Sequence, residues 1–294
     1  MKRIIDEDFI AMLEGHDLCI QNLMNGLFGG NRRSRAYGSS AEFADYRSYT
    51  EGDELKRVDW NLYARFRKLY LKLFVDERQL HHRIYIDASA SMDWGTPAKS
   101  YTALRVGAAL GFLAVQAMDR VTFYSIHDDL CQDLSGTVIG KDAFYRAADQ
   151  LETLTCTGTS RLGEAINNSR ETGSIGGISV LISDFLTDDS WKEAVDRMIQ
   201  KRREVHLIRV LSREEMDPKI TGQFTLVDAE DRSLDYRADF GRAHLKAYHQ
   251  ALEYHQNEIR SFCASRGVGF FTVCTDESIE QMLFDKAVAA GVMA

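Results

Sequence analysis

Carboxyl and hydroxyl side chains are closely spaced at residues 87–91, where Asp87, Ser89 and Ser91 are separated by two alanines. These residues directly follow segment 83–86, which we predict to be a short buried strand. The small residues between them let the loop wrap tightly, so that both serines can face one point. Oxygen ligands of this kind suit Mg²⁺, Mn²⁺ or Ca²⁺ rather than a soft metal. The pattern therefore predicts a divalent metal site at the end of this strand, with Mg²⁺ as the expected ion.

Two further segments carry oxygen ligands that belong with this set. Thr159 lies in a loop before a predicted helix, and Asp184 follows the strongly apolar strand 178–182. Ligands of a parallel α/β sheet bind beyond the carboxyl ends of its strands, so these residues are expected to meet at one edge. The predicted metal ligands are Asp87, Ser89, Ser91, Thr159 and Asp184. So few carboxylates leave positive charge on the ion, which could then accept a carboxylate or phosphate from a partner.

Strands that alternate with helices must position this site. The predicted strands are 83–86, 121–126, 178–182, 205–211 and 268–273, with an antiparallel strand at 130–139 and a hairpin at 224–236. The predicted helices are 101–118, 142–154, 162–170, 190–203, 244–266 and 279–288. Ser190 and Glu193 have the spacing of a capping box. The alternation predicts an α/β fold with a mostly parallel sheet that helices cover on both faces.

The N-terminal part of the chain has a different character. Apolar residues at helical spacing predict a helix over 4–24, which glycines 26, 29 and 30 should end. Residues 31–80 are crowded with charges and aromatics, and 69–75 alternate like a strand. We therefore treat 1–80 as an N-terminal α+β region and 81–294 as the main domain.

The five predicted ligands resemble, position by position, the metal-ion-dependent adhesion site of von Willebrand factor A domains. The resemblance implies a Rossmann-like, doubly wound, mostly parallel sheet with an antiparallel edge strand. In that family the first aspartate and the two serines hold the ion, and the threonine and last aspartate contact it directly or through water. Here Ser160 and Arg161 separate Thr159 from Leu162, which is one residue more than usual.

A block in the N-terminal region resembles the signature of the domain-of-unknown-function 58 family. Its residues are Glu42, Phe43, Arg47, Tyr49, Gly52, Asp53, Arg57, Asp59, Trp60, Ala64 and Arg65. These bacterial proteins place the block directly before a von Willebrand A-like domain, and the resemblance runs from about Gly30 to the C-terminus. It implies partnership with a MoxR-type AAA+ ATPase and a chaperone-like or maturation role. We therefore expect a metal-dependent protein-binding adaptor and not an enzyme.

Composition narrows the classes of function. The net charge of −8 argues against broad, nonspecific binding to nucleic acids. The five cysteines are scattered without a C-x-x-C pair, which is typical of reduced thiols in the cytoplasm. No signal-peptide pattern is visible, and the longest apolar run, 106–115, is shorter than the roughly 20 residues needed to span a bilayer. We expect a cytoplasmic protein. No P-loop or G-x-G-x-x-G motif occurs, so any ATP chemistry would come from another protein.

Two other functions remain open from the sequence. A metal-dependent phosphoester hydrolase would use the ion to orient a phosphate and activate a water molecule, although no histidine lies in the three site segments. A nucleic-acid adapter would use residues 57–72, in which arginines and lysines alternate with aromatics. The simpler interpretation of that stretch is a small sheet with paired charges.

Overall fold

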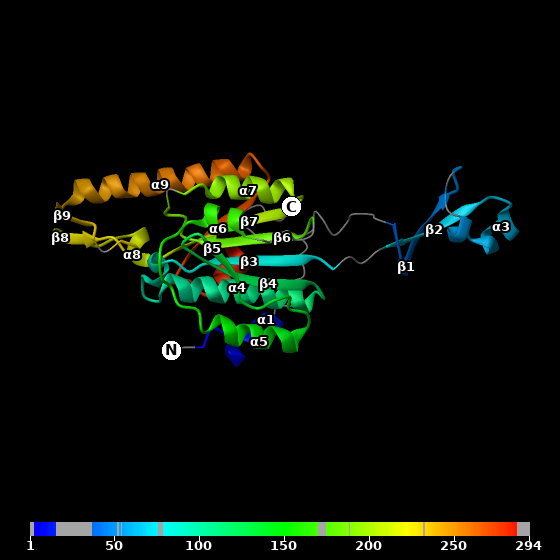
Figure 1. The fold of residues 1–294 in the computed structure, drawn as a ribbon, viewed down its shortest axis with the longest axis horizontal. Coiled ribbons are helices and arrows are strands. Elements are labelled where there is room, and N and C mark those ends of the chain that lie inside the picture. The colour runs from blue at the N-terminus through cyan, green and yellow to red at the C-terminus, as the bar shows by residue number, and fades with distance from the viewer. Residues whose placement is uncertain are drawn as a thin grey trace. The chain divides into compact units, whose positions relative to one another are not determined.

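The chain forms two compact units (Figure 1). The larger unit consists of Met1–Gly30 together with Leu80–Ala294, and the smaller unit is Asn31–Gln79. The computed structural model describes residues 3–15, 37–51, 53, 55–75, 79–169, 175–187, 189–231 and 233–286. The boundary predicted at residue 80 assigns the first helix to the N-terminal region. In the structure, helix α1 (Glu7–Gly15) packs into the larger unit instead. Its side chains Phe9 and Leu13 are buried there, which the amphipathic pattern of one isolated helix does not reveal. No helix in the described ranges is long and apolar enough to cross a membrane.

The larger unit is built on a six-stranded sheet with the order β10-β7-β6-β3-β4-β5. The strands are β3 (His81–Asp87), β4 (Arg120–His127), β5 (Leu130–Asp133), β6 (Ile178–Ser183), β7 (Glu204–Leu211) and β10 (Gly269–Cys274). All neighbours pair in parallel except β4 and β5, which pair antiparallel at the edge. This confirms the predicted sheet. The antiparallel strand is shorter than expected, and Val138 returns only as an isolated bridge to Val121.

Side chains alternate between the two faces of this sheet, and each face has its own apolar cluster. Ile84 and Ile86 of β3 pack with α1, α4 (Lys99–Gln116) and α5 (Lys141–Leu151). Tyr85 between them packs on the other side with α6 (Leu162–Asn168), α7 (Trp191–Gln200) and α9 (Arg242–Ala264). Figure 1 shows these two helical layers on either side of the strands. The fold is therefore doubly wound, as predicted.

Helix α7 illustrates how the local sequence produces these layers. Its buried residues Trp191, Ala194, Val195 and Met198 recur at helical spacing and form a stripe against the sheet. The predicted capping box at its start is wrong, because the Ser190 side chain makes no cap bond to this helix. The Ser190 hydroxyl instead contacts a carboxylate oxygen of the residue before it.

Additional elements extend from the carboxyl end of the strands. They are the 3-10 turn η2 (Ala90–Asp93), helix α8 (Arg213–Met216), hairpin strands β8 (Gly222–Val227) and β9 (Asp235–Phe240), and the π-helical turn η3 (Gln281–Lys286). Strands β8 and β9 pair antiparallel, which confirms the predicted hairpin. The described part of the predicted last helix is η3, and its end lies outside the described residues.

The smaller unit combines a two-stranded antiparallel sheet with a short helix. Strand β1 (Tyr37–Ser48) pairs with β2 (Tyr70–Val75), and η1 (Leu55–Arg57) and α3 (Trp60–Phe66) lie between them in the chain. The Asp59 carboxylate caps α3 by accepting hydrogen bonds from two backbone amides at its start. This helix was not predicted from the sequence. Gly52 of the family signature lies outside the described residues.

Candidate functional site

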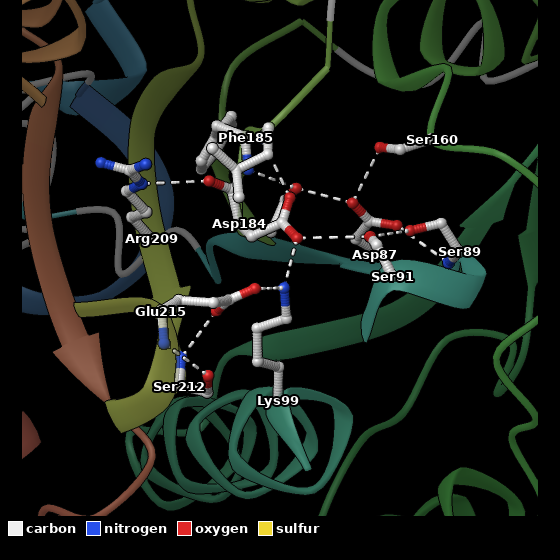
Figure 2. A network of polar contacts seen from close by, with 12 residues as sticks. Asp87, Ser89, Ser91, Lys99, Ser160, Asp184, Phe185, Arg209, Ser212 and Glu215 are labelled. Atoms are coloured by element: carbon white, nitrogen blue, oxygen red, sulfur yellow. Dashed lines mark hydrogen bonds and ion pairs between the residues drawn. The ribbon is translucent and has the colours of Figure 1, made fainter. Parts of the chain in front are cut away.

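Asp87 ends β3 in the middle of the sheet and is fully buried. Its Oδ1 accepts a hydrogen bond from the Ser89 backbone N–H at 2.9 Å. Its Oδ2 accepts hydrogen bonds from the hydroxyls of Ser183 at 2.6 Å and Ser160 at 2.9 Å (Figure 2). These donors are neutral, so the Asp87 carboxylate is oriented by them without being neutralised.

Three more of the predicted ligands form a continuous chain of contacts next to Asp87. The hydroxyls of Ser89 and Ser91 lie 3.1 Å apart, and the Ser91 hydroxyl donates to Asp184 Oδ2 at 3.2 Å. The second Asp184 oxygen accepts from the Leu186 backbone N–H at 2.9 Å. Strands β3 and β6 are parallel neighbours, which brings Asp87 and Asp184 to the same edge of the sheet. The structure thus brings together four of the five predicted ligands.

Thr159 does not join them. Its hydroxyl and backbone N–H both donate to Asp128 Oδ1, at 3.1 and 2.9 Å, in the turn after β4. Gly158 precedes it at φ +75°, where an added Cβ would lie 2.6 Å from the Asp128 carboxylate. The next residue, Ser160, is buried and supplies the hydroxyl that reaches Asp87. The chain has one residue more than usual before Leu162, and the hydroxyl that contacts Asp87 is that of Ser160, one position after Thr159.

Lys99, at the start of α4, was not predicted as part of the site. Its side chain is 1% exposed, and its ammonium lies 2.6 Å from both Asp184 Oδ2 and Glu215 Oε1. Figure 2 shows it extending from the helix between these two carboxylates. Burial alone would lower the pKa of Lys99, but the two carboxylates outweigh burial and raise it. A lysine at the start of a long, mostly apolar helix was the available sequence signal for a buried charge.

Glu215 and Arg209 complete the polar network. Glu215 forms a capping box with Ser212 at the start of α8, so one of its oxygens is held by backbone while the other meets Lys99. Arg209 is fully buried in β7 and donates from Nε to the backbone carbonyl of Asp184 at 3.0 Å. Burial lowers the pKa of Arg209, although the nearby carboxylates oppose this. The site is thus braced from the neighbouring strand.

The charges in this network do not balance. Three carboxylates, Asp87, Asp184 and Glu215, face two bases, Lys99 and Arg209, which leaves one negative charge in excess. The bases lie on the Asp184 side of the network. Burial, and next the negative charge of Asp184, raise the pKa of Asp87 to about 6. A further cation beside Asp87 would relieve this repulsion.

The chemistry of the donor set fits a hard divalent cation. Among the described residues, no group of three or more His, Cys, Asp or Glu side chains is arranged to hold a metal. The donors here are instead two carboxylates, of Asp87 and Asp184, and the hydroxyls of Ser89 and Ser91. Oxygen ligands with few carboxylates are those of Mg²⁺, which retains several waters. Thr159 would not contribute a ligand in this arrangement.

A hollow of about 250 Å³ adjoins the network at Ser160. Its lining residues are Thr159, Ser160, Arg161, Glu164, Thr187 and Asp189. Ser160 belongs both to this hollow and to the hydrogen-bonded shell of Asp87. Ser160 therefore connects the buried polar network to a surface that an external group can reach.

The similarity to known proteins was found in both sequence and structure. Over 252 residues the chain is 28% identical to the uncharacterized protein Mb1516 of Mycobacterium bovis. The matched region covers 82% of this chain and 79% of that protein. The chain has the same identity and coverage to the uncharacterized protein Rv1480 of Mycobacterium tuberculosis. These relatives carry no assigned activity in their names.

Solved structures similar to this chain include two bacterial proteins. The match to the conserved hypothetical protein BatB from Bacteroides thetaiotaomicron covers 72% of this chain and 98% of that chain, at 15% identity and a TM-score of 0.44. A von Willebrand factor type A protein from Catenulispora acidiphila covers 76% of this chain and is covered over 43%, at 10% identity and a TM-score of 0.40. The model of the family described as "Protein of unknown function DUF58" matches residues 45–258, well over half of the chain, and this protein therefore belongs to the DUF58 family.

Proposed function

We propose that the larger unit is a protein-binding module whose docking point is the polar network at the carboxyl edge of the sheet, completed by a divalent cation of the Mg²⁺ type. The observation that carries this proposal is the state of Asp87. It is a fully buried carboxylate with neutral donors, beside a second carboxylate that already has its own cation. Such a charge is costly unless a cation is available to pair with it.

The residues of the network have separate roles in this proposal. Ser89 and Ser91 would hold the ion through their hydroxyls, and Asp87 and Asp184 would balance its charge. Ser160 and Ser183 fix the orientation of the Asp87 carboxylate. When bound, the ion supplies an open coordination position that attracts a carboxylate from a partner. Ser91 is only partly buried, and contact with the partner is expected on its side of the network.

We further propose that the partner is a MoxR-type AAA+ ATPase, for which this chain acts as an adaptor or chaperone-like subunit. Support comes from the family: the signature block between Glu42 and Arg65 resembles that of proteins that work with such ATPases, and the chain belongs to that family. The chain has no recognisable nucleotide-binding loop of its own. Energy from ATP would therefore reach its clients through the partner.

A pull-down of a MoxR-type AAA+ ATPase from the same organism tests the proposal. The purified chain serves as bait in buffer with Mg²⁺ and again with EDTA. We expect recovery in Mg²⁺ and its loss in EDTA, because the partner's carboxylate would then face a network with one negative charge in excess. Equal recovery in both buffers would contradict a metal-bridged contact.

A matched pair of serine variants separates the site from general effects of metal. Ser91→Ala removes one partly buried hydroxyl of the network. Ser265→Ala removes an exposed hydroxyl at the end of α9, outside the network. The proposal predicts that Ser91→Ala loses recovery in Mg²⁺ and that Ser265→Ala retains it. The reverse pattern would place the docking point elsewhere.

A further inference from the structure

Four loops meet around one short segment at the carboxyl edge of the sheet. Gly158 accepts a backbone hydrogen bond from Ala90 in the loop after β3, and Thr159 accepts one from Asp128 in the turn after β4. Ser160 accepts from the Thr187 hydroxyl in the loop after β6. These bonds fix the first three loops to residues 158–160.

The fourth loop is the turn of the β8–β9 hairpin. Its Glu230 carboxylate accepts a hydrogen bond from the Ser160 backbone N–H at 3.1 Å. The turn is itself held by the Asp228 carboxylate, which accepts from the amides of Glu230 and Asp231. The hairpin and α8 lie at the same end of the larger unit in Figure 1. The hairpin turn is therefore a built part of this edge.

Each of these loops exposes a large apolar side chain. Trp94 is 57% exposed, Leu130 is 57% exposed and Leu186 is 49% exposed. The hairpin turn adds Val227 at 55% and Leu234 at 59%. Neighbouring strands lie about 5 Å apart, so loops at the ends of β6, β3 and β4 fall within the area of one standard protein interface. Apolar groups exposed together in this way mark interaction surfaces.

The four loops that expose these apolar side chains also carry carboxylates. The exposed or partly exposed carboxylates of the four loops are Asp93, Asp128, Asp129, Asp189, Asp228, Glu230 and Asp231. On the hollow beside them, Arg161 is paired with Glu164. We call this surface, made of the described residues 93–94, 128–130, 186–187, 189, 227–231 and 233–234, the acidic rim. Its sign repels phosphates and anionic lipids.

We propose that the acidic rim binds a basic, amphipathic segment of the partner protein, with lysines or arginines against the rim carboxylates and apolar side chains against Trp94, Leu130 and Leu186. This inference rests on the proposed function, since it takes the same edge as the docking face. It adds the chemistry of the contact: one partner carboxylate reaches the buried network, and the residues around that carboxylate are basic and apolar. Charge complementarity of this kind speeds association and excludes acidic competitors.

Two fluorescent peptides of 18 residues test the inference on the full chain. Both carry leucines at the same helical spacing; one has lysines and the other glutamates at the remaining positions. Fluorescence anisotropy is measured in EDTA and in Mg²⁺. We expect the lysine peptide to bind in both buffers and to weaken with added salt, because no metal takes part in the rim contact. Absence of lysine-peptide binding at low salt would overturn the inference.

Matched charge variants show whether binding uses the rim or only the acidity of the whole chain. Asp129→Lys with Asp231→Lys reverses two rim charges, and Asp142→Lys with Asp149→Lys reverses two exposed charges on α5. We expect about tenfold weaker binding of the lysine peptide by the rim variant and little change in the α5 variant. Trp94→Ala should weaken binding without altering its salt dependence. Equal effects of the two charge variants would overturn the inference.

The glutamate peptide separates this inference from the proposed function. If that peptide binds in Mg²⁺ but not in EDTA while the lysine peptide does not bind, the metal-bridged docking point stands and the rim inference fails. If the lysine peptide binds through the rim and EDTA leaves the ATPase pull-down unchanged, the rim inference stands and the metal-bridged contact fails.

Discussion

Replacing Lys99 with methionine is the sharpest perturbation of the polar network. Methionine keeps most of the apolar stem in its buried position and removes only the ammonium. Asp184 and Glu215 would then lose the cation that lies 2.6 Å from each of them. Asp184 is only 1% exposed, so water cannot replace the lost partner.

The size of the effect follows from burial. Removing one partner of a buried ion pair costs about 3–5 kcal/mol, because the remaining charge stays buried without compensation. Lys99→Met should therefore lower the free energy of unfolding by about that amount in EDTA. Lys192→Met is a matched control, since Lys192 pairs with Glu258 at the surface and both side chains are at least 40% exposed. Exposed pairs contribute about 0–1 kcal/mol.

Urea denaturation with and without Mg²⁺ measures both variants. If a divalent cation binds in this network, it replaces part of the charge that Lys99 supplied, and Mg²⁺ should stabilise Lys99→Met more than the wild-type chain. A ligand at 100 times its dissociation constant adds about 2.7 kcal/mol. The reasoning is refuted if Lys99→Met in EDTA is destabilised no more than Lys192→Met, or if Mg²⁺ stabilises all three proteins equally.

Three further outcomes are expected. The folded-state pKa of Asp87 is raised to about 6, which lies above its unfolded value. The wild-type chain should therefore lose stability relative to Asp87→Asn as the pH rises from 4 through 6 in EDTA, by a difference on the order of 3 kcal/mol. Parallel pH profiles of stability for the two proteins would contradict this prediction. Ser160→Ala removes a donor to this buried carboxylate and should cost about 1.5–3 kcal/mol in urea denaturation. Thr159→Val affects the partly exposed carboxylate of Asp128 and should cost less; a larger loss in Thr159→Val would reverse the assignment. Gly163→Ala places a Cβ 2.5 Å from the Ser190 carbonyl carbon and should lower the thermal midpoint by several degrees for a loss of about 1–3 kcal/mol. An unchanged midpoint would show that α6 and the start of α7 can separate freely.

The sheet was predictable because hydrophobic patterning is a local signal. Continuous apolar runs such as 178–182 specify strands buried on both faces, and their alternation with helices specifies parallel pairing. Helix α3 was missed because its residues make few buried contacts, and its start depends on one capping carboxylate, Asp59. The placement of α1 in the larger unit depends on contacts between residues far apart in the chain, such as those of Phe9, which no local pattern encodes.

The candidate site was predictable where it follows strand ends. Asp87 and Asp184 end neighbouring parallel strands, so their meeting follows from sheet topology. The partner of Thr159 was not predictable, because the conformation of a loop decides which of two adjacent hydroxyls points inward. Lys99 was missed for a different reason: a buried charge shows itself only through the carboxylates that surround it in space, and Glu215 is distant in sequence.

A titration of the metal-free chain with Mn²⁺, followed by the electron paramagnetic resonance signal of the free ion, tests the central claim most directly. The account predicts one bound ion per chain that Mg²⁺ displaces. It predicts at least tenfold weaker binding in Ser91→Ala and unchanged binding in Thr159→Ala. No uptake of Mn²⁺ up to about 10 mM, or uptake that Ser91→Ala leaves unchanged, would contradict a divalent cation site in this network.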